Sequence, residues 1–100
     1  MVTKDNAKEY LRIPYDEDDS FLEQIIQGGY DYLAAAVDDF EKLQTVDEFS
    51  RKVDLWVLTQ WVPKMFDERE GMQSGAPELN YAARALLTQL QMYEYKEENP

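Results

Sequence analysis

Apolar residues recur at helical spacing along most of this chain, and that periodicity restricts it to an all-α fold. The clearest stripe lies near the C-terminus, at positions i, i+3, i+4, i+7, i+8 and i+11: Leu79, Ala82, Ala83, Leu86, Leu87 and Leu90. An earlier stripe also follows helical spacing: Leu22, Ile25, Ile26, Gly29, Leu33, Ala36, Val37 and Phe40. No stretch shows the apolar–polar alternation of a half-buried strand.

The same pattern predicts a small bundle of about four helices, one short N-terminal helix followed by three longer ones. We place these helices over residues 4–12, 18–40, 46–70 and 77–94. A chain of 100 residues is long enough for one hydrophobic core and too short for two. The prediction is therefore a single helical domain spanning residues 1–100.

Polar residues and prolines indicate where these helices begin and where one of them is interrupted. Thr3 is a candidate N-cap for the first helix. Thr45 and Glu48 stand three residues apart and predict a capping box for the third. Pro77 is expected at or near the first turn of the last helix, where proline is tolerated. Pro63 lies inside the third helix and has no backbone N–H, so we expect a kink there.

Four consecutive acidic residues, Asp16 to Asp19, precede the second helix and raise the question of a metal site. An EF-hand calcium loop needs ligands at alternate positions and a central glycine, and this run has neither. A magnesium site completed by a phosphate-bearing partner stays open. Carboxylates in the first turn of a helix are favourable by ~0.3–1 kcal/mol, because they face unpaired N–H groups. We interpret the run as a helix start and predict no metal site.

Two adjacent glycines, Gly28 and Gly29, fall in the middle of the second helix, where each costs about 1 kcal/mol relative to alanine. A close approach by another part of the molecule would compensate for that cost. We favour a packing notch within the subunit. The alternative is a bend or a contact between subunits.

The segment 46–70 carries more apolar residues than one helix face can hold. One stripe contains Leu55 and Leu58, and a second stripe, displaced around the axis, contains Val53, Val57 and Trp61. Such a helix is either central in its own core or shared with a partner. We take the second stripe as the candidate contact between subunits, with a central buried helix as the alternative.

The residue inventory removes most classes of enzyme and of nucleic-acid-binding protein. The chain has no histidine and no cysteine, no glycine-rich phosphate loop and no nucleophile elbow. We therefore expect no enzyme activity, no catalytic residues and no cofactor. The net charge is −11, and residues 1–50 hold 13 acidic and 4 basic residues, so a tight grip on DNA is not expected. No apolar run is long enough to span a membrane, and no signal peptide is evident, which favours a protein made in the cytosol.

At this point several motifs in a fixed order resemble a known family. The segments are "AKEYLRI", the acidic "DEDDSFLEQII", the end of the third helix "MFDERE", a glycine-containing loop and "APELNYAARALLTQL". Together they resemble the head–tail connector proteins of tailed bacteriophages, also called head-completion or DNA-packaging proteins. Each motif alone is weak, and the resemblance rests on their order and spacing over nearly the whole chain.

The resemblance implies a structural protein of a phage or prophage. Its subunits would form a homo-oligomeric ring beneath the portal protein, extend the DNA channel, and offer a docking surface to the next tail or head-completion protein. Such a protein would be found in the virion, assembled in the bacterial cytoplasm, with DNA passing nearby without tight binding and with no membrane association. Phe66, Arg69 and Glu70 would hold the end of the third helix. The candidate docking loop that follows comprises Gly71, Met72, Gln73, Ser74 and Gly75.

Two alternatives come from other functional classes. An acidic DNA mimic, or another regulatory interaction protein, would bind a basic partner through carboxylates spaced like phosphates. A small metal-dependent enzyme would act through Asp16–Asp19 and would be stabilised by calcium or magnesium.

Overall fold

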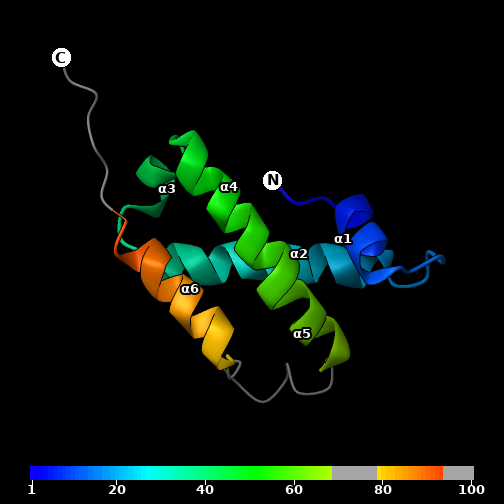
Figure 1. Ribbon diagram of the computed structural model, residues 1–100. Coiled ribbons are helices and arrows are strands. Elements are labelled where there is room, and N and C mark those ends of the chain that lie inside the picture. The colour runs from blue at the N-terminus through cyan, green and yellow to red at the C-terminus, as the bar shows by residue number, and fades with distance from the viewer. Residues whose placement is uncertain (69–78, 94–100) are drawn as a thin grey trace.

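The computed structural model describes residues 1–68 and 79–93, and within these ranges the protein is all-α with no strand (Figure 1). This confirms the predicted fold class. The helices in chain order are α1 (Lys4–Leu11), α2 (Asp19–Ala36), α3 (Phe40–Leu43), α4 (Asp47–Trp56), the π-helical η1 (Val57–Trp61), α5 (Val62–Asp67) and α6 (Tyr81–Gln91).

The core forms where a long central rod crosses α2. Helices α4, η1 and α5 follow one another without a break and make up this rod, which passes over α2 in Figure 1. Helix α1 packs against α2, and α6 packs against α4. The largest completely buried side chains come from α2 and from the rod: Trp56, Phe49, Leu22, Ile25, Leu33, Val53, Val57 and Val62.

Helix α1 begins as predicted, with Thr3 as its N-cap. The Thr3 hydroxyl accepts a hydrogen bond from the Asn6 backbone N–H (3.1 Å), and the Asn6 side chain accepts one from the Thr3 N–H (3.0 Å). These reciprocal bonds satisfy N–H groups that have no partner inside the helix. The helix ends at Arg12, which adopts a left-handed backbone conformation (φ 59°).

Helix α2 is shorter than predicted, because the chain turns after Ala36. Val37 is extended, and Asp39 has a positive φ of 58°, so the helix cannot continue to residue 40. Phe40 instead opens the short helix α3. Val37 and Phe40 are nevertheless buried, which explains why their spacing looked like part of one longer helix.

The start of α4 corrects a second prediction. Val46 is the N-cap residue, and its side chain makes no capping hydrogen bond. The Thr45 hydroxyl donates to the Lys42 carbonyl (2.7 Å) and so belongs to the turn after α3. The predicted capping box of Thr45 and Glu48 is therefore absent.

Pro63 interrupts the rod by widening it. The turn just before it, η1, is π-helical, and the Val62 N–H bonds to the Val57 carbonyl five residues earlier. Proline has no N–H to complete the regular ladder, so the preceding turn can accommodate an extra residue. The irregularity expected at Pro63 takes the form of this π-helical turn.

The glycine pair in α2 is a packing notch within the chain, as favoured from the sequence. A Cβ atom on Gly29 would lie 2.9 Å from Cδ1 of Trp61 and 3.2 Å from Cγ1 of Val57. A Cβ on Gly28 would lie 3.9 Å from the indole, an ordinary contact distance. Only a residue without a side chain at position 29 lets the Trp61 ring reach α2, where its N–H donates to the Ile25 carbonyl (2.9 Å).

Helix α6 begins at Tyr81, four residues later than predicted. Asn80 caps it, and its side-chain oxygen accepts a hydrogen bond from the Ala83 N–H (2.8 Å). A side-chain cap of this kind satisfies one of the N–H groups that have no partner inside the helix. Leu79 precedes the helix and is buried all the same. Pro77 itself lies outside the described residues.

The acidic run before α2 anchors helix α1. The Lys8 ammonium pairs with both Asp16 and Asp19, at 2.9 Å from Asp19, and Lys4 lies 3.3 Å from Asp19. These contacts join two helices that meet at the start of α2. The helix-start interpretation is correct, since α2 begins at Asp19, and the carboxylates also hold α1 in place.

The pairing makes stability depend on pH at the acidic end. The hydrogen bond from Lys8 holds the pKa of the Asp19 carboxyl below its ordinary value. A lowered pKa in the folded state adds stability above the unfolded pKa of about 3.9, and that stability disappears as the pH falls through the folded value. We expect the melting temperature of the wild-type protein to decrease once the pH is lowered beyond about 4.

The variant Asp19→Asn tests this assignment. It should melt lower than wild type at pH 7, and the two melting temperatures should converge as the pH approaches 2, because protonation removes the same charge from wild type. The control is Glu23→Gln, which removes an exposed charge from the same helix. A difference between Asp19→Asn and wild type that is independent of pH would contradict the ion-pair interpretation.

Candidate interaction surface

The three residues predicted to contact another subunit are buried inside their own chain. Val53 and Val57 have no exposed surface, and Trp61 is 5% exposed. Trp61 fills the notch at Gly29 and lies against the ring of Tyr32, with centroids 5.0 Å apart. The prediction is corrected, because side chains enclosed in the core cannot meet a neighbour while the fold is intact. Their burial matches the alternative given above, in which the segment is a central helix of its own core.

The other residues singled out from the sequence lie at or beyond the end of α5. Phe66 is half-buried, and its ring centroid is 6.4 Å from that of Phe21 on α2, so it joins the end of the rod to the start of α2. Arg69 and Glu70 fall outside the described residues. The candidate docking loop, Gly71–Gly75, also falls outside them.

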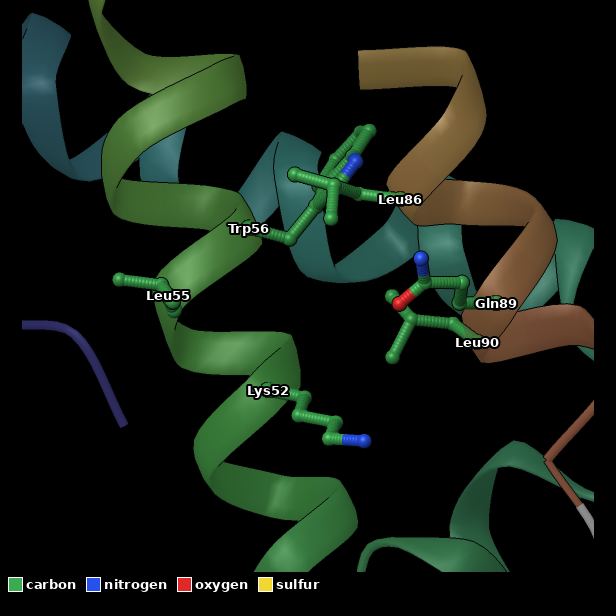
Figure 2. A pocket seen from close by; sticks show the side chains of 6 residues that line it. All are labelled: Lys52, Leu55, Trp56, Leu86, Gln89 and Leu90. Carbon is green, nitrogen blue, oxygen red and sulfur yellow. The ribbon is translucent and has the colours of Figure 1, made fainter. Parts of the chain in front are cut away.

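Helices α4 and α6 enclose an apolar groove with a volume of about 190 Å³. Figure 2 shows Trp56 of α4 and Leu86 of α6 pointing toward each other, with Lys52 reaching from α4 toward α6. Leu55 projects from α4 on the outer side and forms the lip of the groove. The complete lining is Lys52, Leu55, Trp56, Leu86, Gln89 and Leu90.

Trp56 forms the floor of this groove and ties its two walls together. The indole N–H donates to the Ala83 carbonyl of α6 at 3.0 Å. The ring stacks on Tyr32 of α2, with centroids 6.1 Å apart and an interplanar angle of 8°. A buried tryptophan with its N–H satisfied is a rigid element. The groove therefore has a preformed apolar floor.

Two leucines at the groove are unusually open to solvent. Leu55 is 60% exposed and Leu86 is 37% exposed. Tyr81 at the start of α6 and Met92 just beyond its end are exposed as well. Leu55 and Leu86 line the same groove, whereas Tyr81 and Met92 lie outside its lining. Apolar side chains gathered at one place, as opposed to scattered ones, indicate an interaction site.

The surface of α6 carries almost no charge on a strongly acidic protein. Helix α6 contains no acidic residue, and Arg84 is its one charged residue. The exposed positions of the helix are Tyr81, Ala82, Arg84, Ala85, Leu86, Thr88, Gln89 and Gln91. The cores of protein interfaces are depleted in Lys, Glu and Asp and enriched in Tyr, Met and Arg. The face of α6 has this composition, while the whole chain has a net charge of −11.

Sequence reasoning missed the groove and placed Leu55 in a buried stripe. Helical periodicity shows which side chains share a face, but it does not show which other helix covers that face. A signal was present in the sequence, since the segment Tyr81–Gln91 contains one arginine and no acidic residue. Read as an interface composition, it would have indicated this surface.

Other kinds of site find no support in the parts of the chain that the structure describes. Across residues 1–68 and 79–93, no three acidic side chains come together in a way that could hold a metal ion. Within the same ranges, no helix is both long and apolar enough to cross a bilayer.

The fold and this surface define a small all-α protein with a preformed apolar groove between two helices. Comparison of the chain with protein-family models, with curated protein sequences and with solved structures gives no match.

Proposed function

We propose that this protein is a structural subunit that assembles with copies of itself, and that it serves as a head–tail connector of a tailed bacteriophage or prophage. In this role, subunits form a ring beneath the portal protein, extend the DNA channel and receive the next tail or head-completion protein. The proposal combines the order of sequence motifs described above with the surface between α4 and α6.

The observation that carries the proposal is the exposed face of α6 beside the groove, which has one arginine and no acidic residue. A monomer with this net charge and no partner would be expected to place acidic residues on the exposed side of this helix. A groove with a rigid tryptophan floor and two open leucines supports a specific contact, because well-packed apolar anchors supply most of the binding energy of an interface.

The charge distribution is compatible with a channel through which DNA moves. Residues 1–50 have 13 acidic and 4 basic residues, which gives this half of the chain a charge of −9. A surface with that charge repels phosphate groups, so DNA beside it would not adhere. The acidic-mimic alternative gains less support, since Asp16 and Asp19 at the densest acidic run are paired with Lys8.

The variant Leu86→Glu tests the role of the groove in assembly. We expect wild-type protein to form oligomers as its concentration rises, and Leu86→Glu to raise the dissociation constant at least tenfold, because a carboxylate would be buried in an apolar contact. Light scattering across concentration measures the mass, and electron microscopy shows whether large species are rings. The experiment is done at moderate salt, which screens repulsion between chains of charge −11.

The matched control is Gln24→Glu, which adds the same charge on the exposed side of α2. It should assemble like wild type. A Leu86→Glu variant that retained the wild-type mass at every concentration would remove the groove from the proposal. Binding of the assembled rings to a purified portal complex would test the phage role itself.

A further inference from the structure

The exposed large apolar side chains of the described residues fall into separate groups on the surface. Leu55, Leu86, Tyr81 and Met92 lie on or next to α4 and α6. Tyr10 and Tyr15 lie at the end of α1 and in the turn between α1 and α2, and Met1 is at the N-terminus. In Figure 1 the turn between α1 and α2 is at the opposite side of the molecule from α6. One copy thus has two remote surfaces that a neighbour could cover.

These two surfaces have opposite local charge. The single charged residue that lines the groove is Lys52. The turn that contains Tyr15 continues into Asp16, Glu17 and Asp18. Lys52 has a carboxylate partner in its own helix, Glu48 at 3.4 Å, but an exposed pair of this kind contributes only about 0.3–0.5 kcal/mol. An acidic partner from another chain can therefore replace Glu48 at little cost.

The size of the groove matches one aromatic ring. Its volume is about 190 Å³, and an apolar cavity of about 150 Å³ is large enough to hold benzene. A tyrosine ring in the groove would meet Trp56 and the leucines with its apolar part. Its hydroxyl would reach the polar edge, where Gln89 and Lys52 lie.

We propose that the occupant of the groove is the turn between α1 and α2 of a second copy, with the Tyr15 ring seated between α4 and α6 and Glu17 next to Lys52. Tyr15 is suited to this contact because it is 41% exposed and does not belong to the core of its own chain. The Lys8 ion pairs hold the turn in a defined shape before the contact forms. The inference rests on one part of the proposed function, namely that the chain assembles with copies of itself.

The contact is heterologous, because different surfaces of the two copies meet. A pair joined in this way keeps one unused groove on one copy and one unused turn on the other, so further copies can add, and the assembly forms a ring where the rotation between neighbours closes. A two-fold symmetric dimer through α6 alone would leave the turn between α1 and α2 uninvolved. The two arrangements make different predictions for variants of Tyr15.

Two single variants and their mixture test the proposal. Tyr15→Ser removes the inserted ring, and Leu86→Glu disables the groove. Each alone should raise the dissociation constant of assembly at least tenfold. Mixed in equal amounts, they should form a heterodimer and nothing larger, because the intact turn of Leu86→Glu fits the intact groove of Tyr15→Ser and no further contact is possible. Native mass spectrometry resolves the heterodimer when one variant is isotopically labelled.

The control is Gln24→Ser, which changes an exposed residue of α2 outside both surfaces and should assemble like wild type. Normal assembly of Tyr15→Ser, together with loss of assembly in Leu86→Glu, would overturn this inference and leave the proposed self-assembly standing. A wild-type protein that remained monomeric at every concentration and salt would overturn both. A mixture that produced no heterodimer would also contradict the heterologous contact.

Discussion

The variant Trp61→Ala should lose about 3–5 kcal/mol of unfolding free energy, the usual cost of removing a large buried aromatic side chain. Trp61 is almost completely enclosed, and it contacts helix α2 at three places, the Gly29 notch, the Tyr32 ring and the Ile25 carbonyl. A domain of this size has a total stability of roughly 5–15 kcal/mol. The variant should therefore melt at least ~12 °C below wild type, as measured by circular dichroism.

The comparison variant is Trp61→Phe, which keeps a ring and removes the N–H donor. It should cost about 1–2 kcal/mol, from the lost hydrogen bond to Ile25 and a smaller volume. Unchanged stability in Trp61→Ala, with a loss of assembly alone, would contradict the buried position. That outcome would instead indicate that Trp61 lies at the contact between subunits.

The variants Gly29→Ala and Gly28→Ala should change stability in opposite directions. At position 29, the new methyl group would meet the Trp61 ring at 2.9 Å, and the ring is held by the hydrogen bond to Ile25 and by its neighbours. Overpacking of this kind typically costs about 1–3 kcal/mol, which exceeds the gain of about 1 kcal/mol from replacing glycine in a helix. We expect a net loss of up to about 2 kcal/mol, after that partial offset.

Position 28 provides the matched control, because it has the same residue type in the same helix. The nearest atom to a Cβ there is 3.9 Å away, so no overpacking arises. Gly28→Ala should stabilise by about 0.5–1 kcal/mol through helix propensity alone. Urea unfolding of the two variants measures the difference directly. Equal effects at both positions would mean that Trp61 does not depend on the notch.

The sequence was most informative where local chemistry decides the outcome. The Thr3 cap and the start of α2 in the acidic run depend on residues close together in the chain, and both predictions are confirmed. The packing notch at the glycine pair is confirmed as well, although its partner, Trp61, lies far along the chain. The boundaries that were wrong share a different cause. The end of α2, the start of α4 and the start of α6 depend on how the chain turns back onto the core, which periodicity does not report.

The candidate site also separates what local sequence predicts from what tertiary packing decides. Val53 and Val57 were assigned to a surface because the rod has apolar residues on several sides. In the fold, α2 and α6 lie on different sides of that rod and α1 contacts η1, so one chain can cover all these faces. The large apolar side chain that stays exposed on the rod is Leu55, at the lip of the groove, where α6 leaves a face uncovered.

By itself, the order of residues determined that this protein is helical, where its first two helices start, and that it is strongly acidic with no histidine or cysteine. Those properties follow from backbone propensity, capping and charge, which act within a few residues of each other. Only the tertiary structure decided which apolar faces are hidden and which remain open. Burial depends on contacts between segments far apart in the chain, such as Trp61 with Gly29 and Trp56 with Ala83.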